Sequence, residues 1–215
     1  CASGVMSLRD TSIILRKRGL AMQQAVPEGQ GSMVAVLGMS NESVSELMVI
    51  SKCDSQLIQV ANDNDPSQVV ISGEKQEVQN FIAFLKEKKS KRTIDLPVSA
   101  PFHSPLMKHA ASAMETELKK VKLTSPIVPI IQNVDLTVLN STNGLVDRLV
   151  KQICGTVRWR EILIKMVEES SVNTFFEIGP GKVLGGTVKR TISNANVLSV
   201  GLAPQIDQAL EIINE

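Results

Sequence analysis

Residues 57–72, LIQVANDNDPSQVVIS, decide how the middle of the chain folds. The apolar runs at 57–61 and 68–72 are short and contain β-branched residues, and a polar stretch separates them, so each run predicts a strand. Similar runs at 33–37 and 93–96 predict one strand earlier and one strand later in the chain. The middle of the chain is therefore expected to contain four strands.

Helices are predicted in the two gaps between these strands. Residues 42–50 place Val44, Leu47 and Met48 on one helical face. The second helix carries its apolar residues at i, i+3, i+4 and i+7, as Val78, Phe81, Ile82 and Leu85. The order βαββαβ is that of the ferredoxin-like unit, in which two helices cover one face of a four-stranded antiparallel sheet. We predict such a unit over residues 31–97.

The remainder of the chain alternates between helices and strands, which predicts a parallel α/β layer. Strands are expected at 127–132, 174–178 and 197–200, and helices at 11–25, 104–121, 146–153, 160–168, after Gly181 and near Pro204. We therefore predict an α/β core over residues 1–30 and 98–215 with the ferredoxin-like unit inserted into it. The chain begins CASGVM, and a sheet without its leading strands exposes apolar faces, so we expect the first core strands to precede residue 1.

Composition excludes several classes of function. The chain has 23 basic and 22 acidic residues, so no overall field attracts nucleic acid or an anionic membrane. Its apolar runs are far shorter than the roughly 20 residues that cross a bilayer. The cysteines Cys1, Cys53 and Cys154 form no metal-ligand pattern with the two histidines, and they indicate a reducing, cytoplasmic location. No metal site is expected.

His103 is the first candidate for chemistry. It lies in the loop PFHSP at 101–105, between a predicted strand and a predicted helix, where catalytic groups commonly lie. On position alone, a loop histidine that only hydrogen-bonds the backbone is the simpler interpretation. His109 falls on the outer face of the next helix and is expected at the surface. The 215 residues contain no Gly-x-Ser-x-Gly turn, so a candidate base is present without a recognisable nucleophile.

Three further features carry charge or face anions. Arg18 stands near the end of a mostly apolar helix, where a guanidinium can pair with a carboxylate, although a solvated arginine is the commoner case. GPGK at 179–182 opens a helix and offers amides to an anion, but it lacks P-loop spacing, and a sharp turn is the better interpretation. The basic residues within 86–92 and 119–122 are typical of helix ends and are also candidates for docking an acidic protein.

Four motifs together resemble a known family. They are RG at 18–19 ahead of MQQAVP at 22–27, NDPSQVVISG at 64–73, PFHSPLM at 101–107 and EIGPGKVL at 177–184. In order and spacing they are similar to the bacterial stand-alone malonyl-coenzyme A:acyl-carrier-protein transacylases, over essentially the whole chain. That resemblance implies an α/β-hydrolase-like core with a ferredoxin-like insertion. It also implies a monomer that uses a coenzyme A thioester as substrate and needs no cofactor.

The resemblance also implies roles for individual residues. In the family, a serine in Gly-His-Ser-Leu-Gly takes the malonyl group from malonyl-coenzyme A and passes it to acyl carrier protein in fatty-acid biosynthesis. His103 matches the histidine that withdraws the serine proton, and Gln152 matches the glutamine whose main-chain carbonyl orients that histidine. Arg18 matches the arginine that pairs with the malonyl carboxylate, and Asn64 matches an asparagine that lines the cleft.

One departure from the family pattern matters for activity. The serine elbow and the loop that helps to form the oxyanion hole would both precede Cys1, so we expect the 215-residue chain alone not to catalyse the transfer. Two other functions stay open. An acyltransferase domain of a polyketide-type synthase shares these motifs. In a non-catalytic module, His103 and Arg18 would be structural and the basic residues would bind a carrier protein.

Overall fold

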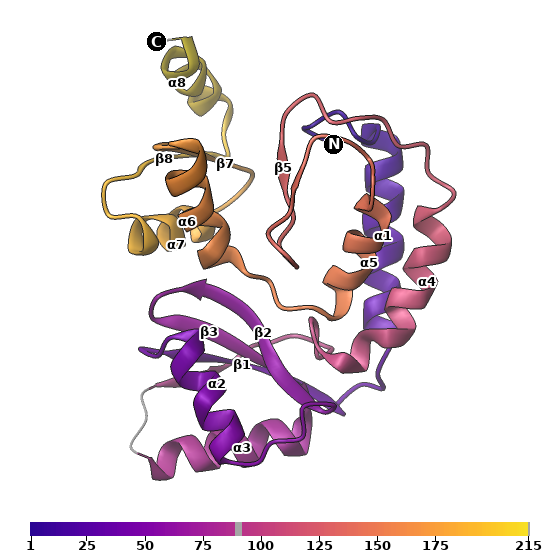
Figure 1. Ribbon diagram of the computed structural model, residues 1–215, viewed down its shortest axis with the longest axis vertical. Coiled ribbons are helices and arrows are strands. Elements are labelled where there is room, and N and C mark those ends of the chain that lie inside the picture. The colour runs from indigo at the N-terminus through magenta and orange to yellow at the C-terminus, as the bar shows by residue number, and fades with distance from the viewer. Residues whose placement is uncertain (89–91, 215) are drawn as a thin grey trace.

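The computed structural model describes residues 1–88 and 92–214, and these form an α/β structure. Figure 1 shows a sheet covered by helices at one end, a group of helices beside it and a smaller layer of strands and helices beyond it. The elements in chain order are α1 (Leu8–Gln24), β1 (Gly31–Leu37), α2 (Asn41–Ile50), β2 (Ile58–Asp65), β3 (Gln68–Glu74), α3 (Lys75–Glu87), β4 (Thr93–Asp95), a 3-10 turn (Pro105–Met107), α4 (Lys108–Leu118), β5 (Ile130–Ile131), β6 (Val138–Leu139), α5 (Leu145–Cys154), α6 (Trp159–Ser170), β7 (Thr174–Ile178), α7 (Val183–Thr191), β8 (Asn196–Val200) and α8 (Ala203–Asn214).

The sheet at one end has the strand order β2-β3-β1-β4, and all neighbouring strands are antiparallel. The predicted element order βαββαβ is confirmed. Strand β2 runs to Asp65, four residues beyond its predicted end at Ala61, with shifts in register after Val60 and after Asp63. The extension is polar in sequence, and it stays in the sheet because Asp63 and Asp65 are buried against arginines from distant helices.

Helices α2 and α3 cover one face of this sheet (Figure 1). The core between them contains Val36, Val44, Val69, Phe81 and Leu85, each at most 1% exposed. The opposite face carries a smaller cluster around Met33, Ala35, Ala61 and Val70, and Phe102 packs on it. This second face therefore supports the loop that holds His103.

Helices α1, α4 and α5 pack together around a second core. Ser7 caps α1, where its hydroxyl accepts a hydrogen bond from the Asp10 amide at 3.0 Å. The predicted helix at 104–121 was too long, because the structure has a 3-10 turn at Pro105–Met107 and an α-helix only at Lys108–Leu118. His109 lies exposed on α4, as expected.

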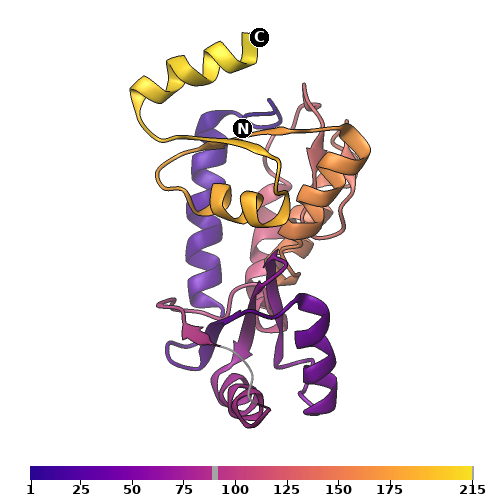
Figure 2. The ribbon, with the colours of Figure 1, turned by 90° about the vertical axis from the view of Figure 1, so that its left-hand side faces the viewer.

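The remaining strands form two small pairs. Strands β7 and β8 are parallel, from Thr174 opposite Asn196 to Ile178 opposite Val200, as the alternation predicts. The predicted strand at 127–132 was wrong in extent and pairing: only β5 is extended, and it pairs antiparallel with the unpredicted β6. Pro126 and Pro129 lack the amides that a longer ladder needs. Both views place α8 at the end of the molecule opposite α3 (Figure 1, Figure 2).

Strand β2 also connects the four-stranded sheet to the rest of the protein. The Val157 amide donates to the Ala61 carbonyl at 2.8 Å, and the Asp63 amide donates to the Val157 carbonyl at 2.9 Å. Arg160 of α6 binds Asp63, and Arg190 of α7 binds Asp65. In the described part of the chain, no helix is long and apolar enough to cross a membrane.

Candidate active site

His103 occupies a tight turn between the sheet and α4. Its φ is +54°, a left-handed conformation that costs a residue with a Cβ about 1–2 kcal/mol. Contacts within the turn hold it: the Ser104 hydroxyl donates to the Pro101 carbonyl at 2.7 Å, and the Phe102 amide donates to the Ala100 carbonyl at 2.9 Å. Ser104 is fully buried. The position of His103 is therefore determined by the surrounding structure, at the expense of local strain.

A glycine lets this turn lie close to the sheet. Gly31 begins β1, and a Cβ on it would overlap the Pro101 ring and approach the Pro101 nitrogen at 2.9 Å. No flexible side-chain end is available there to move away. The start of β1 and the histidine turn are therefore in direct backbone contact, which a larger residue at position 31 would prevent.

The imidazole of His103 contacts the end of α5. Its Nδ1 lies 2.9 Å from the main-chain oxygen of Gln152. The side-chain amide of Gln152 also lies 3.4 Å from Nδ1. The shorter contact is to the carbonyl, which can only accept, so it favours the tautomer with the proton on Nδ1 and a lone pair on Nε2. The sequence predicted this contact through the resemblance, and it is present.

The side chain of the same Gln152 contacts Arg18. The Arg18 guanidinium donates to Oε1 of Gln152 at 2.9 Å, so this one residue binds the histidine through its backbone and the arginine through its amide. Arg18 is partly buried on α1, and burial lowers the pKa of its guanidinium without discharging it at neutral pH. Helices α1 and α5 thus hold a cation beside the histidine.

The surroundings keep His103 neutral. Burial lowers the pKa of the imidazole, and the positive charge of Arg18 acts in the same direction, while hydrogen bonds to the backbone of Gln152 and Gly155 oppose both. The lowered pKa leaves the ring uncharged at neutral pH. A neutral imidazole with a lone pair on Nε2 is able to accept a proton, which is the requirement for a general base.

A cavity opens beside Arg18 and Gln152. Its volume is about 500 Å³, which is in the range of sites for small ligands. The apolar part of its lining comes mainly from α1, α4, α5 and α6, and Gln132 and Asn133 add polar groups. The Thr11 hydroxyl, on the same lining, is buried without a hydrogen-bond partner among the described residues. Arg18 and Gln152 therefore line this cavity, whereas His103 is not among the described residues that line it.

Comparison with known proteins assigns the chain to a family. A family model described as an acyl transferase domain matches residues 1–211. The chain belongs to the malonyl transacylase family of acyl transferases. The resemblance found in the sequence is confirmed.

Individual relatives agree with this assignment. The chain is 38% identical over 214 residues to the malonyl CoA-acyl carrier protein transacylase of Bacillus subtilis, covering 100% of this chain and 67% of the relative. The acyl-carrier-protein S-malonyltransferase of Bartonella henselae superposes with a TM-score of 0.93 at 45% identity, covering 100% of this chain and 68% of the other. A malonyl-transacylase solved in complex with a type II PKS acyl-carrier protein superposes at 0.91 with 34% identity, covering 98% and 67%. The chain thus spans about two thirds of the length of these relatives.

Three of the four residues singled out in this transacylase-family chain lie together, and one lies elsewhere. Arg18, His103 and Gln152 form a connected group. Asn64 lies on β2, partly exposed, between two buried aspartates. Within the described ranges, no hydrogen bond joins its side chain to His103 or Arg18. The assignment of Asn64 to the cleft stays a prediction.

The sequence analysis missed Gln59, a polar residue inside the apolar run of β2. Its amide nitrogen donates to the main-chain oxygens of His103 and Cys154, both at 2.7 Å. A glutamine within a strand that is otherwise apolar is the one local signal of such a contact. Its partners, 44 and 95 residues away, are not recognisable from the pattern.

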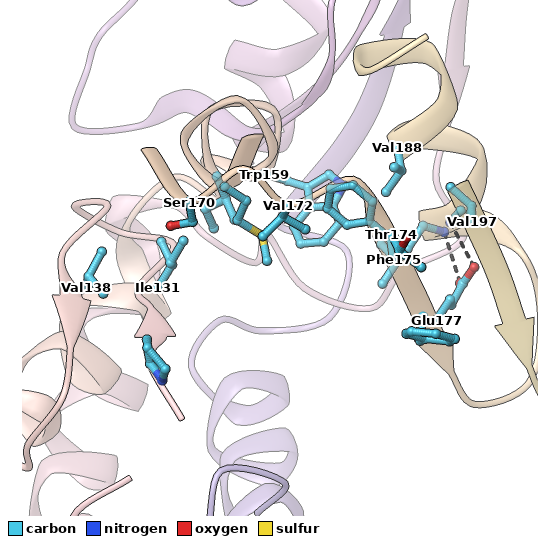
Figure 3. A pocket seen from close by; sticks show the side chains of 16 residues that line it. Ile131, Val138, Trp159, Ser170, Val172, Thr174, Phe175, Glu177, Val188 and Val197 are labelled. Atoms are coloured by element: carbon cyan, nitrogen blue, oxygen red, sulfur yellow. Dashed lines mark hydrogen bonds between the residues drawn. The ribbon is translucent and has the colours of Figure 1, made fainter. Parts of the chain in front are cut away.

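The helix start at GPGK already has an anionic partner within the protein. The Glu177 carboxylate accepts from the amides of Leu184 and Gly185 at 3.0 and 2.8 Å (Figure 3). These hydrogen bonds lower the pKa of Glu177. The interpretation of this segment as a turn, rather than as a phosphate site, therefore agrees with the structure.

The predicted basic docking residues are only partly covered by the structure. Residues 89–91, in the middle of the first cluster, lie outside the described residues. In the second cluster, Lys119 pairs with Glu115 and Lys120 pairs with Glu117. Much of that positive charge is therefore compensated locally. No group of three or more His, Cys, Asp or Glu side chains in the described ranges is arranged to hold a metal ion.

Proposed function

We propose that this chain is the larger part of a malonyl-coenzyme A:acyl-carrier-protein transacylase of fatty-acid biosynthesis, which works through a malonyl-serine ester. The observation that carries the proposal is the group formed by His103, Gln152 and Arg18: one residue orients a neutral histidine and contacts a cation at the edge of a cavity. Family membership and the names of the relatives support it.

In this proposal, His103 transfers the protons of both half-reactions. Its Nε2 accepts the proton of the serine hydroxyl while the serine oxygen attacks the thioester carbonyl of malonyl-coenzyme A. The hydrogen bond from Nδ1 to the Gln152 carbonyl stabilises the imidazolium, as an acidic residue does in a Ser-His-Asp triad. The proton then passes to the departing coenzyme A thiolate. In the second half-reaction, the carrier-protein thiol gives its proton to Nε2 and attacks the ester carbonyl. The bond to the serine oxygen breaks, and Nε2 returns the proton to that oxygen, which restores the serine and the neutral histidine.

Arg18 provides specificity for malonyl over acetyl. A guanidinium with one N–H on Gln152 has further N–H groups for the malonyl carboxylate. Acetyl has no carboxylate, and its binding would leave the partly buried cation unpaired. Discrimination then arises from the penalty on the wrong substrate.

The nucleophile and the oxyanion donors are proposed to belong to residues outside these 215. The chain contains no Gly-x-Ser-x-Gly turn, and it spans about two thirds of its relatives. We further propose an α/β-hydrolase-like core at residues 1–30 and 98–215 with a ferredoxin-like subdomain at 31–97. The strand order β2-β3-β1-β4 supports the second assignment. We also propose that the protein is a monomer in the cytoplasm, that it uses no cofactor, and that Asn64 lines the cleft.

The partner in the second half-reaction is acyl carrier protein. Support comes from the neighbour solved with a type II PKS acyl-carrier protein, and the same neighbour favours a polyketide-type acyltransferase as the second candidate function. A module that only binds a carrier protein has less support, because the Gln152 contact leaves Nε2 of His103 unprotonated, which binding alone does not require.

The proposal is tested with the protein encoded by the complete gene. Malonyl transfer from malonyl-coenzyme A to acyl carrier protein is measured for the wild type, for His103→Ala and for His109→Ala, the exposed histidine on α4. We expect kcat/KM to fall by about 10²–10⁴ for His103→Ala and to stay unchanged for His109→Ala. The 215-residue chain should yield no malonylated protein by intact mass spectrometry. Undiminished transfer by His103→Ala, or a malonyl ester on the 215-residue chain, would refute the assignment.

The same protein tests the role of Arg18. Arg18→Ala should lower kcat/KM for malonyl-coenzyme A and raise the relative use of acetyl-coenzyme A. Arg16→Ala, an exposed arginine on the same helix, is the matched control and should change neither. An unaltered malonyl-to-acetyl ratio in Arg18→Ala would show that another group recognises the carboxylate.

A further inference from the structure

Gln59 connects the two segments that meet at the histidine. Its Nε2 donates one hydrogen bond to the His103 carbonyl and a second to the Cys154 carbonyl, each at 2.7 Å. The NH₂ group of a glutamine has two protons, so both are used. Cys154 ends α5 two residues after Gln152, whose carbonyl accepts the hydrogen bond from His103 Nδ1. The same amide therefore holds both partners of that contact.

The strand that carries Gln59 is itself firmly held. It pairs along its length with β3, and two further contacts attach it to the segment after α5: the Thr156 hydroxyl donates to the Val60 carbonyl at 2.6 Å, and the Val157 amide donates to the Ala61 carbonyl at 2.8 Å. A side chain from this strand can thus fix a loop more precisely than another loop residue can.

The His103 turn needs such a support. Its left-handed backbone is strained, and its other hydrogen bonds join residues within 100–107 to one another. They maintain the shape of the turn but do not attach it to α5. Among the described residues, the contacts of Gln152 and of the Gly155 backbone act on the His103 ring, whereas the Gln59 amide attaches the backbone of the turn to the end of α5.

We propose that Gln59 is a positioning residue, which sets the distance and orientation between the His103 ring and the Gln152 carbonyl by holding the His103 and Cys154 carbonyls with one amide. The consequence for catalysis rests on the proposed function. The positional effect itself does not, because it concerns a contact within the protein. Loss of the amide should release the ring from its single tautomer and expose the Nδ1 proton to exchange with solvent.

The test uses the protein encoded by the complete gene, in which exposed His109 is an internal reference for His103 and the two signals are assigned with His103→Gln and His109→Gln. Imidazole nitrogens and the Nδ1 proton are followed by NMR in the wild type, in Gln59→Met, which keeps the side-chain length without a donor, and in Gln59→Asn, which keeps the amide but is one methylene shorter. Gln76→Met is the matched control, because the Gln76 amide donates to Asn80 on the surface of α3.

We expect both Gln59 variants to raise the exchange rate of the His103 Nδ1 proton about tenfold, which is the effect of losing the one hydrogen bond that holds the His103 carbonyl. The ring should also change from one tautomer to a mixture, while the His109 signals and the circular dichroism spectrum stay unchanged. The control should match the wild type. If Gln59→Met does not fold, Gln59→Asn decides alone. Wild-type exchange and a single His103 tautomer in a folded Gln59 variant would overturn the proposal.

A measurement of activity distinguishes a failure of this inference from a failure of the proposed function. In the protein encoded by the complete gene, Gln59→Met should lower kcat by about 10-fold to 100-fold with little change in KM, because a misplaced base slows the chemistry more than the binding. An NMR effect together with an inactive wild type would reject the transacylase assignment and retain the positional role. An active wild type with an unchanged His103 signal in the variants would reject the positional role alone.

Discussion

The four-stranded sheet with α2 and α3 differs sharply from the β7–β8 pair with α6, α7 and α8. In the first region, apolar side chains such as Phe81 and Ile71 are covered by that region's own helices and are at most 1% exposed. In the second, Ile178 and Val183 are 75% and 76% exposed. An apolar cavity of about 540 Å³ lies between β7 and the strands β5 and β6 (Figure 3).

This difference shows how each region obtains its stability. The first region buries enough apolar surface to be held by its own core. The second depends more on polar links to β2, through Arg160 with Asp63 and Arg190 with Asp65, and on the hydrogen bond from the Trp159 indole to Thr187 at 2.8 Å. Stability within one chain need not be uniform, and regions with fewer buried apolar contacts open first.

The largest expected loss of stability is seen when one phenylalanine from each region is replaced. Phe81→Ala should lower the free energy of unfolding by about 3–5 kcal/mol, because it leaves a cavity in a closed core. Phe175→Ala, on the partly exposed strand β7, should cost about 1 kcal/mol. Urea unfolding followed by far-ultraviolet circular dichroism measures both. Equal losses would remove the distinction between the regions.

A smaller loss of stability is expected for a substitution where the two regions join. Arg160→Met keeps an unbranched side chain but removes the partner of the fully buried Asp63, and it should cost about 1.5–3 kcal/mol. The single tryptophan, Trp159, lies beside this link, so its fluorescence should report unfolding at lower urea than circular dichroism does in the variant. Arg158→Met, which removes a pair with Glu161 within the same connection, is the control. Coincident transitions in Arg160→Met would mean that the link does not couple the regions.

The smallest expected effect is a dependence of stability on pH from His103, at the boundary of the first region. Burial lowers the pKa of this imidazole, so the unfolded chain binds more protons than the folded one below the ordinary value of 6.5. Stability should therefore fall as the pH drops through 6.5, and the loss should be complete below the lowered pKa. His103→Gln should reduce this loss relative to His109→Gln. If the free energy of unfolding depends on pH in the same way in both variants, the burial of His103 would be contradicted.

Local pattern was sufficient for elements whose neighbours in sequence are also their partners in packing. The strand at 174–178 was predicted to the residue, and the two helices over the sheet were predicted from their apolar spacing. Local pattern failed where a contact with a distant residue determines how far an element extends. Strand β2 continues through a polar stretch because Arg160 and Arg190 bind its aspartates, and those arginines lie 97 and 125 residues away in the chain.

The candidate site likewise contains residues that the sequence indicated and one that only the fold revealed. The resemblance indicated Arg18, His103 and Gln152, and the structure joins them through one glutamine. Gln59 had no such indication, because its function as a donor depends on two main-chain oxygens that carry no side-chain signature. Backbone acceptors are the same at every residue, so only the fold reveals which of them a buried amide meets.

The contact between Gly31 and Pro101 limits how this protein can change during evolution. A side chain at position 31 would overlap the proline ring, so substitution there requires a compensating change in the histidine turn. The two positions, separated by 70 residues, therefore form an epistatic pair: the effect of a mutation at one depends on the residue at the other. Sequence variants that differ at position 31 are expected to differ at position 101 as well.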